Sequence, residues 1–590
     1  MCGIAGFMLN ERAVPPREVL DTLQQALAHR GPDGVKRHVD YGLGLVHTRL
    51  AIIDLKTGDQ PLFGPNGTLL IANGEIYNYV ELKRNFPSEK FATSSDCELP
   101  LMTYAAAQGA DFAKPLRGMY AIALADPKAG ALFLSRDPFG IKPLYYAECS
   151  SGVLFASEPE AILKTGLVAR GISTKVATEL LQLQFTTGER TIFPGINRVA
   201  PGETLTLRQG RITERQRIAA LPHAPSLALN EEEALVLLES ALKDSVLVHQ
   251  RSDVPYGMFL SGGIDSSALL ALMARLNDRP VQAFTAGFPG TEARDERAHA
   301  KAVARAVGAQ HIEIEVTEND FWTTLPAIAA AMDDPAADYA VLPTYLLAKE
   351  AARRVKVVLC GEGGDELFAG YGRYRSALRS RWFGGRQMRR RGLLDGLGIL
   401  RDPSGWRQGM DDAEKRIAAK GGTRLQQAQA LDCADWLPND LLLKVDRCLM
   451  AHGLEGRTPF LDPVVAELAL RLPDGLKIRN GVGKYILRKW LARALPAADA
   501  FSRKRGFTVP VAKWIEKRAR TLAPLVARAE GIAQICHPER VEALFHSFGS
   551  GGGKHEGAAC WQLLFYALWH RIHVEDRPSR GDIMSVLEAR

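Results

Sequence analysis

The chain has 590 residues, of which 46% are apolar and 24% charged, a composition typical of a soluble globular protein with more than one hydrophobic core. Its formal net charge of +7 is small for this length, so it suggests anionic ligands without requiring nucleic acid. The eight cysteines form no zinc-like cluster, and no apolar run has the length of a membrane span. We therefore expect reduced thiols, no structural zinc, no membrane partner and a cytoplasmic location.

Cys2 directly follows the initiator methionine. If Met1 is removed, Cys2 carries a thiol and a free α-amine on one residue. An α-amine has a pKa near ~8 and can take the thiol proton, which is the arrangement used by N-terminal nucleophile hydrolases. A small apolar residue at a frayed chain start would look the same, so Cys2 alone leaves both interpretations open.

The first third of the chain is predicted to be rich in β-structure. A helical spacing of apolar residues over 16–27 comes first. Polar residues stand at the ends of the strands that follow, among them Arg49, Asn73, Gly74, Glu75 and Asp96. The predicted strands are residues 44–46, 50–53, 69–72, 120–124, 132–134 and 144–146.

A second domain is predicted to begin near residue 230. Residues 222–225 have the composition of a linker, and Asn230 with Glu233 resembles a helix N-cap pair. Strands and helices then alternate, which favours a parallel sheet covered by helices on both faces, with ligands at the carboxyl ends of the strands. The predicted strands are residues 256–260, 281–284, 311–316 and 355–359.

The run Phe259-Leu260-Ser261-Gly262-Gly263-Ile264-Asp265-Ser266-Ser267 joins the first of these strands to a helix. Its glycines allow close backbone approach, and the free N–H groups and helix dipole favour an anion. A lone Ser-Gly-Gly is usually no more than a turn, but the whole run indicates a phosphate site. No Gly-Lys-Ser/Thr closes it as in a Walker A loop. It resembles the SGGxDSS loop of ATP pyrophosphatases, which release pyrophosphate and leave AMP on a substrate.

Several further motifs occur in the order of one known family. Those of the first third resemble a class II glutamine amidotransferase domain. Together with the later motifs, they make the chain similar to glutamine-hydrolysing asparagine synthetases from about residue 2 to beyond 515. The motifs are residues 2–4, 29–33, 47–54, 73–78, 95–98, 360–366, 444–447, 453–462 and 483–488.

This resemblance implies a two-domain α/β protein. The N-terminal domain, residues 2–215, would be an Ntn-hydrolase α/β/β/α sandwich that acts as a glutaminase. The C-terminal domain, residues 230–530, would be a doubly wound parallel-sheet ATP-pyrophosphatase (PP-loop) domain with an arginine-rich insertion at about 373–430. Residues 531–590 would form a helical tail.

The resemblance also implies the glutaminase roles. Cys2 would attack the side-chain amide of glutamine while two donors stabilise the oxyanion. One cation and two carboxylates would hold the free amino-acid head group, although such residues taken singly are more often surface ion pairs. These roles fall on Asn73 and Gly74 for the oxyanion, Arg49 for the α-carboxylate, and Glu75 and Asp96 for the α-ammonium.

In the second domain, Lys484 aligns with the catalytic lysine of the family, which stabilises phosphate charge as pyrophosphate leaves; alone it would be a solvated lysine at a helix start. Asp265 and Asp365 would bind Mg²⁺ with ATP. The acceptor acid would contact Glu362, Asp365 and Arg457. Cys360 replaces the usual serine, a change we expect to matter little because the backbone makes the contact. The remaining ATP contacts would be Leu260, Ser261, Gly262, Gly263, Ser266, Ser267, Phe288, Gly361 and Glu362.

The sequence therefore predicts a glutamine-dependent amidotransferase that adenylates a carboxylic acid with Mg-ATP and passes ammonia to it through an internal tunnel. L-aspartate is the expected acceptor; a peptidoglycan, peptide or sugar acid is the first alternative. A regulatory protein with a decayed enzyme fold is the second. The run Arg389-Arg390-Arg391 would belong to a solvated helical insertion or to a patch for an anionic partner. We expect a homodimer that binds no nucleic acid.

Overall fold

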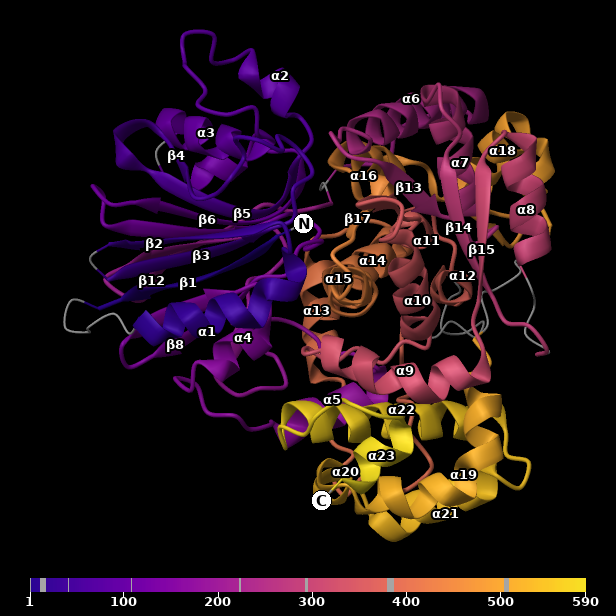
Figure 1. Cartoon of the computed structure of the whole chain (residues 1–590). Helices are drawn as coiled ribbons and strands as arrows, with labels where there is room; N and C mark the ends of the chain where they lie inside the picture. Colours follow the sequence, from indigo (N-terminus) through magenta and orange to yellow (C-terminus); the bar gives the residue numbers. More distant parts are fainter. Residues whose placement is uncertain are drawn as a thin grey trace.

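Figure 1 shows the chain as a computed structural model that describes residues 2–10, 17–40, 42–107, 109–221, 224–291, 296–378, 387–502 and 509–589. Met1, Pro16 and the linker residues 222 and 223 lie outside this set. An N-terminal part with two antiparallel sheets stands beside a C-terminal part with one parallel sheet, and the last helices pack below the second part in this view. In the described ranges, no helix has the length and hydropathy needed to cross a membrane.

Two six-stranded sheets stack face to face in the N-terminal part, with apolar side chains of both sheets in the core between them. Helices α1 (Arg17–Leu27) and α4 (Pro159–Lys164) cover one outer face, and α3 (Leu99–Ala107) covers the other. These four layers confirm the predicted α/β/β/α sandwich. The first sheet runs β10 (Ile196–Arg198), β8 (Tyr145–Cys149), β9 (Gly152–Ala156), β1 (Gly3–Leu9), β3 (Leu43–Arg49), β2 (Gly34–Asp40), and the second β12 (Arg211–Arg217), β11 (Glu203–Arg208), β7 (Ala131–Arg136), β6 (Gly118–Asp126), β5 (Leu69–Ile76), β4 (Leu62–Phe63).

One predicted strand of this part is wrong. Residues 50–53 have an irregular backbone, although their apolar run is typical of a strand. The Leu50 carbonyl faces the Cys2 thiol, with 3.9 Å between oxygen and sulfur. The Ile52 carbonyl accepts an N–H from Asp253, 3.0 Å away in the C-terminal part. The segment is apolar because it is buried between the two parts of the molecule.

The C-terminal part is built on a five-stranded parallel sheet of order β15, β14, β13, β16, β17. Helices α6 (Glu231–His249) and α7 (Ile264–Leu276) pack on one face, and α10 (Val341–Ala351) and α15 (Leu443–Met450) on the other. This confirms the doubly wound sheet. The chain leaves β13 in one direction and later returns beside it with β16, so the switch point for a ligand lies between these two strands. The strands are Gln310–Glu315, Gln282–Gly287, Tyr256–Phe259, Val357–Leu359 and Glu455–Arg457.

The described part of the insertion contains α12 (Gly372–Leu378), α13 (Gln408–Ala419) and α14 (Arg424–Leu431). The π-helix Asp432–Leu442 follows and leads directly into α15. Arg389 packs on the rings of Phe185 and Trp436, whereas Arg390 and Arg391 are exposed.

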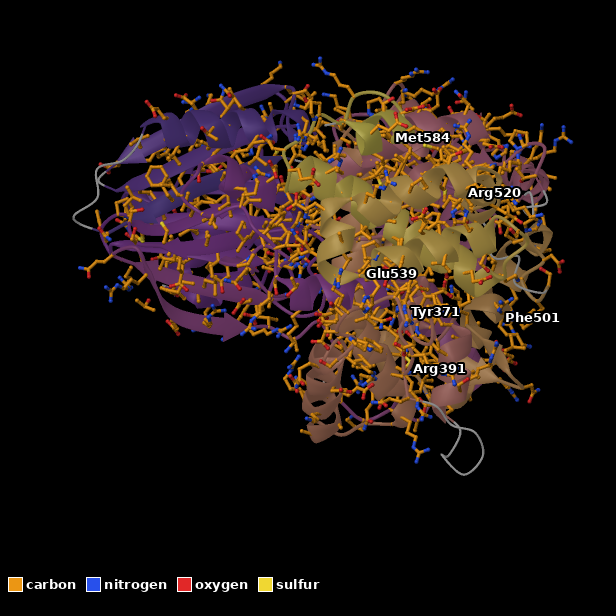
Figure 2. All side chains as sticks on the ribbon, turned by 90° about the horizontal axis from the view of Figure 1, so that it is seen from below. Tyr371, Arg391, Phe501, Arg520, Glu539 and Met584 are labelled. Carbon is orange, nitrogen blue, oxygen red and sulfur yellow. The ribbon has the colours of Figure 1, made fainter. Side chains whose placement is uncertain are left out.

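The C-terminal helices, from α19 (Val511–Arg528) to α23 (Ile583–Glu588), are an integral layer of the fold. Seen from below, those that carry Glu539 and Met584 cover the half of the molecule that contains the parallel sheet (Figure 2). Helix α22 (Lys554–His573) is largely buried, and its Trp561 indole donates to the Ala337 carbonyl at 2.7 Å.

Candidate active site

The predicted nucleophile, Cys2, lies just before β1 in the middle of the first sheet. Its side chain is buried, and its backbone N–H donates to Asn73 Oδ1 at 3.1 Å. Burial raises the pKa of the Cys2 thiol, so the reactive thiolate needs a nearby base. Activation of the thiol by the α-amine of Cys2 stays a prediction, because Met1 lies outside the described residues.

Asn73 and Gly74 lie next to each other on β5 of the second sheet. The Asn73 side chain is held through its oxygen by Cys2, while its Nδ2 donor is buried and has no partner among the described residues. A buried, unused donor beside a nucleophile is what an oxyanion requires. A Cβ on Gly74 would lie 2.1 Å from the Met119 carbonyl oxygen, so no other residue fits there.

The predicted glutamine-binding charges are also buried in this region. Arg49, at the end of β3, pairs with Asp59 at 2.6 Å. Asp96 accepts the Ile76 N–H at 2.6 Å. Burial raises the pKa of Asp96 to about 6, and it raises the pKa of Glu75 well above its usual range, with Asp96 adding to the shift. Two neighbouring buried carboxyls with raised pKa values would be stabilised in their charged form by an ammonium group.

The predicted nucleotide loop lies between β13 and the N-terminus of α7, as expected from the sequence. Gly262 has φ +67°, a conformation that glycine adopts without strain. The Ser261 and Ser266 hydroxyl oxygens lie 3.1 Å apart. The Ser267 hydroxyl is buried without a partner among the described residues. The loop therefore presents hydroxyl groups and a helix N-terminus at the switch point of the parallel sheet.

Lys484 reaches this loop from far along the chain. Its Nζ contacts the Asp265 carboxylate and lies 2.7 Å from Asp365 Oδ1. Lys484 is buried just before α18 (Tyr485–Ala494). Burial opposes its charge, but Asp265 and Asp365 outweigh this effect and raise the pKa of Lys484. A charged, fixed ammonium thus stands beside the predicted pyrophosphate loop.

The other predicted contacts lie at the same sheet edge, in the segments after β14 and β16. Gly361 packs on Asp265: a Cβ added to it would lie 3.2 Å from Asp265 Cβ. Burial raises the pKa of Glu362, although Lys444 opposes the shift. Leu260, Phe288 and Cys360 are all buried. Their predicted roles toward ATP stay predictions.

The chain matches known proteins along most of its length. Residues 237–571 match the asparagine synthase family, and residues 1–217 match the glutamine amidotransferase domain family. The chain belongs to the glutamine-hydrolysing asparagine synthetase family. The protein is accordingly a glutamine-hydrolysing, ATP-dependent carbon–nitrogen ligase.

Three curated relatives illustrate the similarity. Glutamine-hydrolyzing asparagine synthetase 1 of Bacillus subtilis is 32% identical over 98% of both chains. A putative asparagine synthetase of Mycobacterium bovis is 34% identical over 98% of both chains. Asparagine synthetase B of Escherichia coli is 30% identical over 88% of this chain and 84% of that protein.

In this synthetase, Arg457 lies between the two domains. It is fully buried on β17, and its guanidinium is 2.6 Å from Glu455 and 3.3 Å from Glu75 of the glutaminase domain. Its predicted role in acceptor binding is not tested by these contacts. They show that one predicted glutamine-binding carboxylate already faces a cation of the synthetase domain.

A second interdomain contact involves residues without a role in the sequence analysis. Arg30 Nε donates to the Cys2 carbonyl at 3.2 Å, and its Nη atoms contact both oxygens of Asp446 at 2.8 and 3.0 Å. Glu158 accepts a further bond at 2.7 Å. Lys444 belongs to the same helix as Asp446, so α15 connects the surroundings of Cys2 with those of Glu362. Arg30 and Asp446 both lie in recognised motifs, but a single sequence does not reveal that the two side chains are in contact.

Proposed function

We propose that the protein hydrolyses glutamine at Cys2, activates L-aspartate as acyl-AMP with Mg-ATP, and lets ammonia displace AMP to form asparagine. The observation that carries this proposal is the Lys484 ammonium held by Asp265 and Asp365 beside the loop 261–267. Pyrophosphate release needs a fixed cation at the leaving group, and this loop lacks the lysine of a Walker A motif.

In the glutaminase half, Cys2 would attack the amide after its α-amine takes the thiol proton. The Asn73 amide and the Gly74 N–H would stabilise the oxyanion that forms. Glu75 and Asp96 would bind the α-ammonium of glutamine. Arg49 would bind the α-carboxylate, in exchange for part of its pairing with Asp59.

In the synthetase half, Asp265 and Asp365 would hold Mg²⁺. The pair fits this role because two carboxylates already share one cation, Lys484, and Mg²⁺ prefers oxygen ligands. When bound, the ion would neutralise phosphate charge. Lys484 would stabilise the negative charge that grows on the leaving oxygens, and the serines of the loop would bind the pyrophosphate.

The acceptor is proposed from family membership and from one local feature. Lys444, which pairs with Asp338 at 2.7 Å, supplies positive charge near Glu362. A second carboxylate of an acidic substrate, such as the α-carboxylate of aspartate, would be stabilised there. Another carboxylic acid of similar charge stays the alternative. The homodimer and the cytoplasmic location stay predictions.

The test is a screen of carboxylic acids for AMP release in the presence of glutamine, ATP and magnesium. The proposal predicts that L-aspartate gives the highest kcat/KM and that asparagine appears in equal amount to AMP. If the enzyme instead prefers a peptide, peptidoglycan or sugar acid, the proposed reaction would stand but L-aspartate would be the wrong acceptor. Intact mass should show that the active protein begins at Cys2.

A further inference from the structure

A cleft of about 1630 Å³ lies between the two domains, away from both reaction centres. The glutaminase domain contributes α5 (Thr174–Leu183) and β12, and the synthetase domain contributes α13, α14 and the π-helix Asp432–Leu442. Neither Cys2 nor Lys484 lines it. Its volume exceeds the roughly 300–1,000 Å³ typical of small-molecule sites, so it has room for a ligand with several charged groups.

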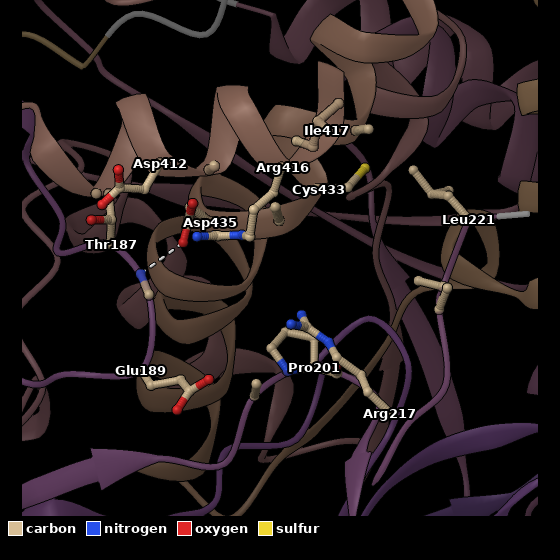
Figure 3. Close-up of a pocket in the computed structure, with 18 of the residues that line it drawn as sticks. Thr187, Glu189, Pro201, Arg217, Leu221, Asp412, Arg416, Ile417, Cys433 and Asp435 are labelled. Atoms are coloured by element: carbon tan, nitrogen blue, oxygen red, sulfur yellow. Dashed lines mark hydrogen bonds between the residues drawn. The ribbon is translucent and has the colours of Figure 1, made fainter. Parts of the chain in front are cut away.

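Positively charged side chains from both domains line this cleft. Arg217 on β12 and Arg416 on α13 extend into the same space from different walls (Figure 3). Lys175, Arg190 and Lys420 also line it. In the part of the chain that the structure describes, none of these five cations has a carboxylate within ion-pair distance. Arg217 Nε donates to the Pro201 carbonyl at 2.9 Å, a bond to a neutral group that leaves the guanidinium charge in place. Like charges that converge in this way favour an anion between them.

The acidic side chains of the cleft are Glu179, Glu189, Asp412 and Asp435, and each has a hydrogen-bond or ion-pair partner; Gln408 Nε2 donates to Asp412 at 3.2 Å. Asp435 accepts the Gly188 N–H at 2.7 Å, as Figure 3 shows, and Glu179 accepts the Thr187 N–H at 2.9 Å. Glu189 pairs with Arg215 at 3.4 Å. Burial raises the pKa of Glu179 to about 7, so this carboxyl is partly protonated near neutral pH. Burial raises the pKa of Asp435, although Arg416 opposes the shift. Eight cationic and four acidic side chains line the cleft, so its net charge is positive.

We propose that this cleft binds a small polyanion, a molecule with at least two phosphate or carboxylate groups, at a site separate from both reaction centres. Arg217 and Arg416 belong to different domains, so a ligand that contacts both bridges the domains. A macromolecular anion fits less well, because the cationic side chains line one cleft from both domains and do not form a stripe along a surface.

The position of the cleft gives the ligand a means to act on the reaction. Asp435 lies on the π-helix, which continues into α15. Helix α15 carries Asp446, which holds Arg30 beside Cys2, and Lys444, which lies near Glu362. A ligand that fixes the π-helix against the glutaminase domain is expected to reduce the glutamine hydrolysed per AMP formed. This expectation rests on the proposed function; binding itself does not.

The test is calorimetric titration of the full-length protein with inorganic tripolyphosphate and, separately, with citrate, in the absence of glutamine and acceptor. At least one probe should bind the wild-type protein. The double variant Arg217→Ala/Arg416→Ala should bind that probe at least about tenfold more weakly, a loss of about 1.4 kcal/mol. The control Arg520→Ala, which removes an exposed arginine from α19 outside the cleft, should bind as the wild type does.

Stronger binding of tripolyphosphate would identify a phosphate ligand, and stronger binding of citrate a carboxylate ligand. Binding equal in the wild type and the double variant would overturn the proposal, because the probe would then occupy another site such as the ATP loop. Lack of binding by both probes would overturn it as well. A single-stranded DNA 12-mer is tested in the same way. If it binds more tightly than either probe and loses affinity in the double variant, the cleft binds nucleic acid and the small-polyanion proposal is overturned.

Discussion

Replacing Lys484 by alanine removes the one cation seen to contact both Asp265 and Asp365 in the described structure. The ammonium is fixed in the ground state, so it contributes most where negative charge grows, at the oxygens between the α and β phosphates. Loss of one such pre-positioned group typically costs about 2.7–4 kcal/mol of transition-state stabilisation. We therefore expect kcat for AMP release to fall by about 10²- to 10³-fold, with little change in the KM for ATP.

The same substitution removes the ammonium from two partly exposed carboxylates, whose side chains are 16% and 21% exposed, so we expect the free energy of unfolding to fall. Thermal unfolding of the whole chain reports whether the variant is folded, and basal glutaminase activity should be unchanged, because Cys2 lies in the other domain. Lys489→Ala is a matched control on α18, the helix that directly follows Lys484, since Lys489 pairs with Glu231 at the surface. Lys484→Arg should restore little activity, because a planar guanidinium does not replace a compact ammonium.

The assay is steady-state AMP release with glutamine and aspartate, measured for the wild type, Lys484→Ala, Lys484→Arg and Lys489→Ala. A Lys484→Ala enzyme with near-normal AMP release would refute the reasoning. So would a variant whose only defect is a raised KM for ATP, because that result would assign Lys484 to ground-state binding.

Three further changes separate the parts of the mechanism. Cys2→Ala should abolish glutamine-dependent synthesis and leave synthesis from added ammonium; loss of both in a folded protein would contradict separate centres. Because the pKa of Asp96 is raised to about 6, the Asp96 carboxyl is mostly neutral below that pH and no longer attracts the α-ammonium of glutamine. We therefore expect kcat/KM for glutamine to fall as the pH drops through 6. Asp96→Asn should lower this value about 10- to 100-fold and flatten the pH profile; an unchanged profile would exclude Asp96. Arg30→Ala should leave the buried Asp446 carboxylate without its Arg30 partner, lower the free energy of unfolding by about 3–5 kcal/mol and raise the amount of glutamine hydrolysed per AMP formed. The control Arg37→Ala, at an exposed ion pair, should change neither quantity.

The sequence predicted those features that depend on local pattern. Strands β3, β5, β6 and β7 contain the predicted apolar runs, and the capping box at Asn230 is present. Binary patterning sets such elements because each buries one face against a neighbour. The predicted strand at residues 50–53 is absent. The segment is apolar because it packs between the domains and beside Cys2, not because it pairs with a neighbouring strand.

Contacts between residues far apart in the sequence could be predicted only where both residues belong to motifs of a known family. The approach of Lys484 to Asp265 agrees with the motif match, and it could not be inferred from spacing because 219 positions separate the residues. Arg30 and Asp446 are 416 positions apart, and no local rule pairs them. The side chain of Arg457 reaches Glu75 because of its position on the three-residue strand β17, which is too short to show alternation in the sequence.

The most direct test of the account is to identify the nucleotide products when the enzyme consumes ATP with glutamine and aspartate. Phosphorus NMR of the reaction mixture distinguishes cleavage between the α and β phosphates from cleavage between the β and γ phosphates. The account predicts AMP and pyrophosphate in equal amounts, formed together with asparagine and released about 10²- to 10³-fold more slowly by Lys484→Ala at the same enzyme concentration. ADP and inorganic phosphate as the primary products would contradict the role given to the loop 261–267 and to Lys484.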